Sequence, residues 1–352
     1  MALSFSLDPA TARTPRLRAI LNDDTLLAVQ SAQTTHHGSY SAASYNLVVP
    51  ISEGVGLSKA EWASLGQARV RIQVSLNPNQ PFTDLVEGYC DKIQIHPVIG
   101  CAHLAGRDLS ASMIDNKSPS DYQNQSPAEI VQAICQRHGL TAVVTATASF
   151  AGRCYAGNST VVSLAQYTAL SSDWDVLVCL GQTLGFDVFI VGHTLYFRPS
   201  ISVSDTPQYV YAGRLVDLSM LRMLPLSGGS TVTISSWNSA LGASVTATAN
   251  SDSSGTASYS DGKIAASYLG MLPNASVSEA QALASRVAQS INAEAMSIEF
   301  SMPGDISLNT MQPLRLCGSN TAFDVTYKID CIVRKFRPRS GFVQTVRAKL
   351  LT

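Results

Sequence analysis

The chain has 352 residues, which is more than one ordinary hydrophobic core serves and indicates two or three domains. Its formal net charge is −1 and 14% of its residues are charged, against about 25% in a typical soluble domain. Lys and Arg form no long block, which argues against a protein that reads duplex nucleic acid.

Ser, Thr, Ala and Gly take the place of the missing charged residues. A neutral surface of small side chains suits a subunit packed among neighbours, although an uncharged polar globular protein has the same composition. The basic residues gather weakly at two places, where they alternate with apolar or turn residues and are interpreted as solvated strand faces. These places are Arg13, Arg16 and Arg18, and Arg334, Lys335, Arg337 and Arg339.

The sequence shows neither a membrane span nor a secretory signal. No apolar run approaches the roughly 18 residues that cross a bilayer, and the N-terminus lacks a basic start followed by a long apolar stretch. The cysteines form no C-x-x-C pair and their number is odd, so reduced and mostly buried thiols are expected. They are Cys90, Cys101, Cys135, Cys154, Cys179, Cys317 and Cys331.

Residues 1–107 are predicted to form a small antiparallel barrel or sandwich. The turn cluster Asn22-Asp23-Asp24 lies between the first two apolar runs and predicts a hairpin. A short helix is expected where Ser58 and Glu61 form a capping box. The remaining strands are predicted from apolar runs or from alternation of apolar and polar residues. The expected strands cover residues 17–21, 26–29, 45–51, 70–76 and 85–95.

Residues 108–199 are predicted to form a compact α+β module. At 126–129 the order Ser-Pro-Ala-Glu places an N-cap, a proline in the first turn and a capping glutamate in register, and the helix is expected to end at Gly139. A second helix is expected between 172 and 185. A hairpin with Gly192 in its tight turn then closes the module.

Residues 200–352 are predicted to form a second, C-terminal β-barrel domain. One helix is expected over 276–296, where a capping box precedes an Ala-rich apolar stripe that allows close packing. The stretch 240–262 is rich in Ser, Ala, Thr and Gly, and is expected to be a mobile hairpin or a loop ordered by partners. The last strands are expected over 327–333 and 342–350.

A search for catalytic and cofactor motifs returns little. The sequence contains no G-x-S-x-G, no H-E-x-x-H and no G-x-x-x-x-G-K-[ST]. Gly54 and Gly56 begin like a dinucleotide fingerprint, but Lys59 stands where the third glycine belongs, so a turn before a helix is favoured.

The most metal-like group is His96, Cys101 and His103. A zinc site needs three or four ligands at settled spacing, and no second pair follows nearby, so a structural role is favoured for the three. Asp173 and Asp175 are interpreted as a cap and a macrodipole partner at a helix start, not as paired catalytic carboxylates.

The remaining histidines are also given structural interpretations. His138, next to Gly139, is expected to meet free carbonyls at a helix end. His36 and His37 precede Gly38 and are expected in a solvated turn. No catalytic, cofactor-binding or metal-ligating residue is therefore predicted, and the chain is not expected to be an enzyme.

Several phrases occur in an order and spacing that carry a resemblance to a known family. They lie at 87–93, 106–115, 126–130, 138–140, 173–177, 185–188, 196–199, 235–238 and 340–342. Together they resemble the phage late-control protein D family, the baseplate hub proteins of contractile tails, which are related to the hub part of type VI secretion spike proteins. The likeness covers roughly residues 80–350 and is best between 87 and 199.

The resemblance implies a mainly β homotrimer with two tube-type antiparallel β-barrel domains per chain, flanking the α+β module. Three chains then present six similar barrels in a pseudo-sixfold ring. The implied partners are further copies of the chain, a tail tube or tube-initiator protein and a central spike protein. Tape-measure and baseplate wedge proteins are further candidates, and DNA is expected only in transit through the lumen. No cofactor and no stable membrane insertion are implied.

The expected function is that of a structural baseplate hub in a contractile phage tail or tail-like particle, joining the sixfold tube to the threefold spike. We expect synthesis in the bacterial cytoplasm without a signal peptide, followed by incorporation into the particle. No repeat-rich β-helix and no lysozyme-like domain is recognisable in the sequence, so the spike and any wall-cutting activity are expected on other proteins. The alternatives are the hub of a non-contractile tail or gene-transfer agent, a secretion or tailocin adaptor that loads an effector, and a hydrolase with a divergent site.

Overall fold

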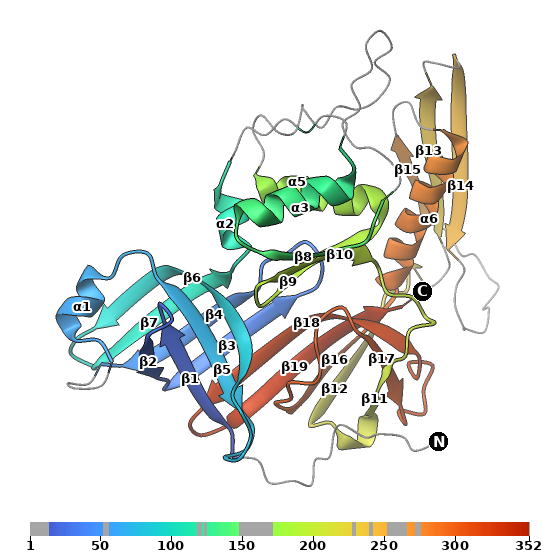
Figure 1. Cartoon of the computed structure of the whole chain (residues 1–352). Coiled ribbons are helices and arrows are strands. Elements are labelled where there is room, and N and C mark those ends of the chain that lie inside the picture. The colour runs from blue at the N-terminus through green and yellow to red at the C-terminus, as the bar shows by residue number, and fades with distance from the viewer. Residues whose placement is uncertain are drawn as a thin grey trace.

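The computed structural model describes residues 14–51, 56–117, 122, 125–147, 172–226, 230–238, 242–251, 266–271 and 276–351. Strands from both ends of the chain form one 13-stranded sheet, and two three-stranded sheets lie to one side of it (Figure 1). Helices cover both of the smaller sheets. The expectation of a mainly β chain with an α+β module is confirmed.

The large sheet runs in the order β12-β16-β19-β18-β3-β4-β7-β6-β5-β1-β2, with β17 paired to β18 and β11 paired to β17. Its strands are antiparallel except for the β11–β17 pair. The strands are β1 (Arg16–Leu21), β2 (Thr25–Ala28), β3 (Ser31–His37), β4 (Ser44–Pro50), β5 (Arg69–Ser75), β6 (Thr83–His96), β7 (Cys101–Asp108), β11 (Gln208–Tyr211), β12 (Asp217–Arg222), β16 (Met296–Pro303), β17 (Pro313–Cys317), β18 (Thr326–Arg337) and β19 (Gly341–Leu350).

The expected pair of closed barrels is not found, since no sheet of the described residues closes on itself. The N-terminal and C-terminal strands continue into one another, because β3 pairs with β18 from Ala32 opposite Phe336 to His37 opposite Cys331. The β3–β18 pairing satisfies backbone N–H and C=O groups that would remain unpaired at the edges of two separate open sheets. The domain boundaries at 107/108 and 199/200 stay a prediction.

In the N-terminal half, the elements form where the turn residues, the capping box and the apolar alternation predict them. Asn22 and Asp23 both have positive φ, as a tight hairpin turn requires, and they join β1 to β2. Ser58 caps α1 (Lys59–Ser64), and Glu61 bonds back to the Ser58 backbone in a complete capping box. The alternation predicted over 70–76 is realised in β5, where Val70, Ile72 and Val74 are buried.

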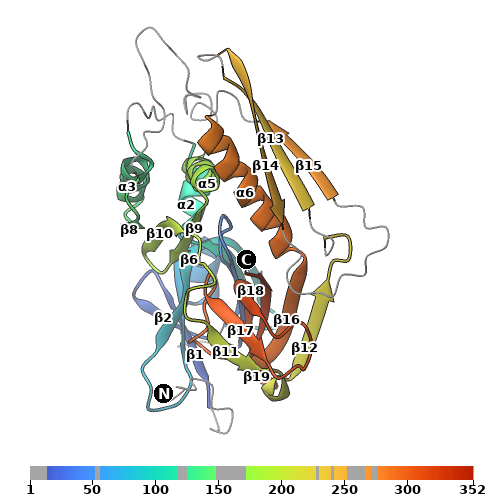
Figure 2. The ribbon, with the colours of Figure 1, turned by 90° about the vertical axis from the view of Figure 1, so that its right-hand side faces the viewer.

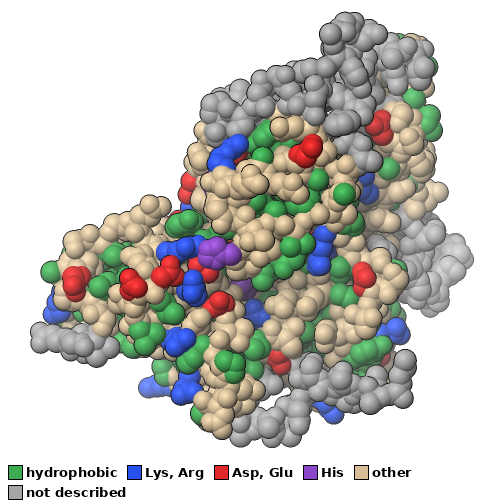
Figure 3. Space-filling view, in the orientation of Figure 1, with side chains coloured by type: hydrophobic (Ala, Val, Ile, Leu, Met, Phe, Trp, Pro, Cys, Tyr) green, Lys and Arg blue, Asp and Glu red, His purple; other side chains and the backbone are tan. Residues whose placement is uncertain are grey.

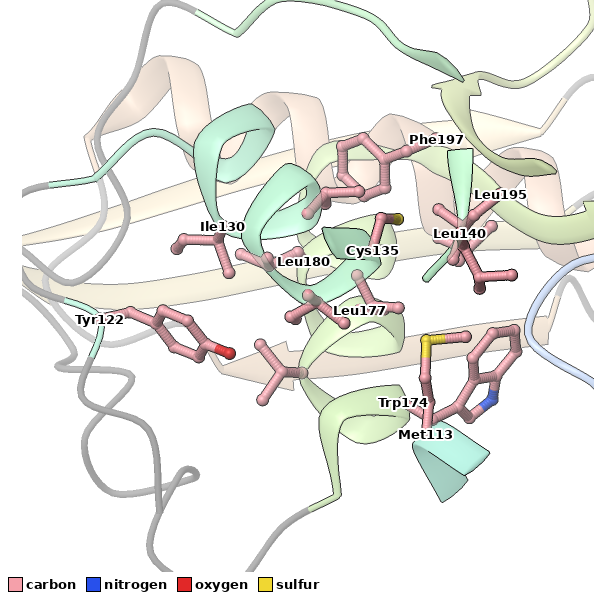
Figure 4. Close-up of a cluster of buried hydrophobic side chains, with 14 of the residues drawn as sticks. Met113, Tyr122, Ile130, Cys135, Leu140, Trp174, Leu177, Leu180, Leu195 and Phe197 are labelled. Carbon is pink, nitrogen blue, oxygen red and sulfur yellow. The ribbon is translucent and has the colours of Figure 1, made fainter. Parts of the chain in front are cut away.

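The α+β module packs three helices on one face of the sheet β8-β10-β9. A core of apolar side chains, drawn in Figure 4, fills the space between them, with Trp174, Leu177, Leu195 and Phe197 among its members. Neither α2 nor β8 is predicted from the sequence; β8 is short and pairs in parallel with β10. The elements are α2 (Ala111–Asp115), α3 (Pro127–Arg137), β8 (Thr141–Val144), α5 (Asp173–Leu184), β9 (Phe186–Val191) and β10 (Thr194–Pro199).

The other three-stranded sheet is covered by a single helix, seen side-on in Figure 2. Helix α6 (Val277–Ala293) buries Ala280, Ala284 and Ala288 against the sheet, as its small-residue stripe predicts. The sheet order is β14-β13-β15. Part of the 240–262 stretch is therefore a regular strand, not a loop, and 239–241 and 252–265 lie outside the described residues. The strands are β13 (Ser230–Asn238), β14 (Ala243–Ser251) and β15 (Ala266–Met271).

The described cysteines are all free, and they are buried or half-buried as expected; Cys154 and Arg13 lie outside the described residues. Within the described ranges, no helix combines the length and the apolarity needed to span a bilayer. A 3-10 helix, η1 (Ala212–Arg214), lies between β11 and β12.

Candidate assembly surfaces and interior polar contacts

A buried carboxylate, Asp187, joins three parts of the chain. It lies on β9 of the α+β module and accepts hydrogen bonds from Ser39 Oγ at 2.7 Å and Ser200 Oγ at 2.8 Å. Lys328 on β18 of the large sheet places Nζ 2.9 and 3.0 Å from its two oxygens. A buried carboxylate is stable only when it is paired and hydrogen-bonded, so these contacts fix the module against the sheet.

A second charged contact lies at the other end of the same module. Glu87 on β6 is buried, and its carboxylate lies 3.1 Å from Arg69 Nε, 3.3 Å from Arg71 Nη2 and 3.2 Å from His193 Nδ1. His193 occupies the β9–β10 turn, so its ring reaches from the module onto the sheet. Figure 3 shows side chains of both charge signs and histidine gathered where the module meets the large sheet.

The loop between β3 and β4 provides the third link. Tyr40 has a positive φ of 71°, and its backbone N–H donates to Val188 O at 2.9 Å while its hydroxyl donates to Phe186 O at 2.5 Å. Trp174 Nε1 donates to the Tyr40 carbonyl at 3.3 Å. Burial raises the pKa of Tyr40 to about 12, so it stays a neutral donor. The three links join the module to the large sheet and to its β3–β4 loop.

A Ser-His-Asp chain occurs inside the module. Ser112 Oγ lies 3.1 Å from His138 Nδ1, and His138 Nε2 lies 2.8 Å from Asp173 Oδ2. The expectation that His138 meets free carbonyls is wrong for its ring, which Asp173 holds; Asp173 is not simply a cap residue either, because Ser172 and Asp175 form the capping box. Sequence spacing gave no sign of this contact, because Ser112, His138 and Asp173 lie on separate elements.

The geometry of this chain fits a structural link between α2, α3 and α5. Arg137 Nη1 lies 2.9 Å from each oxygen of Asp173, so the same carboxylate binds Arg137 as well as His138. Ser112 Oγ also donates to Leu109 O at 3.0 Å, a local bond inside its own helical turn. A nucleophile needs its hydroxyl proton directed at the base, and here that proton has a backbone acceptor.

A row of buried polar side chains crosses the middle of the large sheet. Thr34, Arg334 and Gln344 are buried and lie opposite one another on β3, β18 and β19. Arg334 donates to the carbonyls of Asp305 and Leu308, and burial lowers its pKa to about 10. The expectation of a solvated strand face is therefore wrong for Arg334, whose side chain points inward.

His36 continues this row on β3. It was expected in a solvated turn, but it belongs to the strand and its Nε2 is buried. Burial, together with the charges of Arg334 and His37, lowers the pKa of His36 to about 3. Within the described residues, His36 Nε2 and the side-chain amide of Gln344 have no hydrogen-bond partner. The neutral ring is therefore the form that the fold accommodates.

The metal-like group does come together in part. His96 lies opposite Cys101 across the β6–β7 pair, Cys101 Sγ is 3.6 Å from His103 Nε2, and the two histidine rings meet edge to face with centroids 5.0 Å apart. In the part of the chain that the structure describes, no three such side chains are arranged to hold a metal ion. The contacts present are those of a cross-strand cluster.

The strand β12 forms an exposed apolar edge of the large sheet. Among the described residues it pairs with β16 on one side only. We call Val216, Met220, Leu221 and Met223 the β12 edge surface; their exposed fractions are 74%, 38%, 55% and 42%. Natural proteins usually protect free edges with charged side chains, proline or bulges. On β12 the charged residues, Asp217 and Arg222, are confined to the two ends of the strand.

No protein-family model and no curated protein matches the sequence. Solved structures do match. The tail protein from Neisseria meningitidis MC58 is 9% identical, with a TM-score of 0.70 over 96% of each chain. The 43 kDa tail protein of prophage MuSo2 from Shewanella oneidensis is 12% identical, with a TM-score of 0.67 over 95% of this chain and 96% of that one.

A third match is the E. coli c3393 protein, a component of the type VI secretion system described as structurally similar to the T4 tail proteins gp27 and gp5. It is 11% identical, with a TM-score of 0.56 over 95% of this chain and 77% of that one. The chain therefore has the fold of phage tail proteins, and the resemblance to the late-control protein D family is confirmed at the level of the fold.

Proposed function

We propose that the chain is a structural subunit of a phage tail or tail-like particle, and specifically its baseplate hub. The observation that carries this proposal is the match to a tail protein over 96% of both chains. A match over nearly the whole length of both chains is a likeness of the whole fold rather than of a single common motif. The proposed hub joins a sixfold tail tube to a threefold spike.

The free edges of the large sheet support a homotrimer. Among the described strands, the main path of the large sheet ends in β12 on one side and in β2 on the other, and β11 ends a side branch. Two unlike edges of one chain can pair head to tail. Such heterologous contacts generate closed rings when the rotation closes. The apolar β12 edge surface then becomes buried between copies, where exposed apolar area is stabilising instead of hazardous.

A central spike protein is the second proposed partner. The chain matches a chain of the Francisella PdpA-VgrG complex with a TM-score of 0.53, covering 96% of this chain and 58% of that one. The type VI likeness also supports the runner-up, a secretion adaptor that loads an effector. An effector gene beside the gene for this chain favours the adaptor, and a sheath gene favours the contractile tail. Without either, the hub of a non-contractile tail or gene-transfer agent is the remaining alternative.

We also propose that the chain works without catalysis. The Ser112–His138–Asp173 chain is the arrangement closest to a catalytic one among the described residues, and its bonds to Arg137 and Leu109 O fit a structural link. The hub then acts by geometry: it closes a ring, carries the spike and moves with it.

The absolute mass of the purified chain, measured by light scattering with and without tube and spike proteins, tests this function. Three times the chain mass, with a ring in negative-stain images, is the expected result. Leu221→Asp introduces a charge on the β12 edge surface and should reduce the mass to that of the monomer. Ile99→Asp is the matched control, because Ile99 is 77% exposed on the β6–β7 turn, away from the edge.

A chain that stays monomeric with both partner proteins present overturns the proposed function. A Leu221→Asp variant that trimerises like the wild type overturns the assigned edge while leaving the trimer in place.

A further inference from the structure

A basic hollow lies on the large sheet. Its volume is about 300 Å³, and it spans five neighbouring strands, β18, β3, β4, β7 and β6. The cations at it are Lys92, Lys335 and Arg337, and the amides are Gln33, Asn46 and Gln94, with His103 beside them. We call these seven residues the basic hollow.

The sheet register explains why these side chains converge. Lys335 lies opposite Gln33, Gln33 opposite Asn46, and Asn46 opposite Ala105, which in turn faces Lys92. In the next row His103 lies opposite Gln94. Residues in register project on the same face of a sheet. The row therefore has a lysine at each end, with two amide side chains and one alanine between them.

The charge at the hollow is uncompensated. No acidic side chain lines it, and among the described residues no ion pair engages Lys92, Lys335 or Arg337. Two other cations of the sheet are ion-paired: Arg107 with Asp91 at 2.8 Å, and Arg347 with Asp330 at 2.9 Å. A hollow with clustered cations and no counter-charge concentrates anions.

The uncharged side chains of the hollow indicate which kind of anion it binds. Binding of single-stranded nucleic acid uses aromatic rings as stacking platforms. Of the two ring side chains at the hollow, Phe336 packs in the interior cluster with Val74 and Phe342, and the His103 ring meets His96 edge to face. The amide side chains of Gln33, Asn46 and Gln94 carry both donors and acceptors, which match the N–H and C=O groups of an extended peptide. The volume is near the lower limit of small-ligand sites, enough for a few residues.

We propose that the basic hollow binds an extended acidic peptide segment of a partner protein. Its carboxylates pair with Lys92 at one wall and with Lys335 and Arg337 at the other, while its backbone lies over the amides. This inference does not rest on self-association through β12, which lies three strands beyond β18 in the sheet.

The probe for a binding test is a fluorescein-labelled ten-residue peptide of alternating Glu and Ser, with a Gln-Ser peptide as the uncharged control. Fluorescence anisotropy at low salt should show at least roughly tenfold tighter binding of the Glu-Ser peptide, and this preference should fade as salt screens the charges. The double variant Lys92→Glu and Lys335→Glu should lose the preference. Lys59→Glu with Lys117→Glu is the matched control, because it makes the same charge change at exposed positions away from the hollow.

Zero-length carbodiimide coupling, which joins a peptide carboxylate to a lysine amine with loss of water, locates the bound peptide. Mass spectrometry should find the peptide on Lys92 and Lys335 in preference to Lys59. Equal coupling at Lys59, or equal binding of the Gln-Ser peptide, overturns the proposal. Tighter binding of a ten-nucleotide oligo-dT than of the Glu-Ser peptide overturns it in favour of nucleic acid. Light scattering on the same samples reports self-association separately, so failure of the hollow is distinguishable from failure of the proposed hub.

Discussion

Lys328 Nζ lies 2.9 and 3.0 Å from the two carboxylate oxygens of Asp187, 141 residues away in the sequence. The pair connects β18 of the large sheet to β9 of the α+β module. The hydroxyl groups of Ser39 and Ser200 donate further hydrogen bonds to the Asp187 carboxylate. The buried Asp187 carboxylate is therefore one of the three links that hold the module against the sheet.

Asp187→Ala should lower the free energy of unfolding by about 3 kcal/mol, because it leaves the Lys328 ammonium without its buried partner. Asp330→Ala is the control: Asp330 is more exposed and pairs with the half-exposed Arg347, so its loss should cost about 1 kcal/mol or less. Urea unfolding of the two variants checks the difference. Equal losses would show that Asp187 is not a structural junction.

Stability should depend on pH through His36. The folded state lowers the pKa of His36 from 6.5 to about 3, so the unfolded state binds the proton more readily. The contribution of the neutral ring is fully present above pH 6.5 and is lost as the pH falls from 6.5 towards 3, by up to about 1.4 kcal/mol per pH unit.

Urea unfolding at a series of pH values between 7.5 and 4.5 measures this slope. His36→Gln should flatten it, whereas His37→Gln, at the exposed neighbour, should leave it unchanged. If both variants keep the wild-type slope, another group is responsible for the acid sensitivity.

The Ala stripe of α6 should not accept a larger side chain. Ala284 is buried against β13 and β14, so Ala284→Leu should destabilise the helix and its sheet by about 1–3 kcal/mol through overpacking. Ala282→Leu is the control on the exposed face of the same helix. Hydrogen exchange of the α6 amides should rise in the first variant and stay unchanged in the second; equal protection would contradict the close packing.

The Ser112–His138–Asp173 chain should behave as a structural link. His138→Ala removes one partner of the buried Asp173 and should cost about 1–3 kcal/mol. Ser112→Ala should cost less than about 1 kcal/mol, because a bond within one turn is replaced most easily. A fluorophosphonate probe should leave the wild type unlabelled. Labelling that disappears in both variants would instead identify Ser112 as a nucleophile.

Most helices and hairpins were predictable because their signals are local. The capping boxes at Ser58, Ser126 and Ser276 form with both hydrogen bonds in place, and Gly185 ends α5 with a positive φ of 72°. Each signal acts within three or four residues, so the folded chain cannot easily override it. Short elements without caps, such as β8, carried no such signal.

The candidate surfaces could not be predicted from the sequence. The alternation in 334–339 predicts a strand but does not indicate which face is covered. It therefore cannot show that Arg334 is buried or that Lys335 lines a hollow. The Ser112–His138–Asp173 contact was also invisible, since it joins three elements whose packing no spacing encodes.

The sequence by itself determined the helices with their caps, the hairpins, the low surface charge and the order of phrases that resembles tail hub proteins. Only the tertiary structure decided that β3 pairs with β18, which merges the two expected barrels into one open sheet, and that this sheet carries an apolar edge and a basic hollow. The reason is physical: a cap is closed by neighbours along the chain, whereas a strand edge accepts whichever partner the packing of the whole molecule brings beside it.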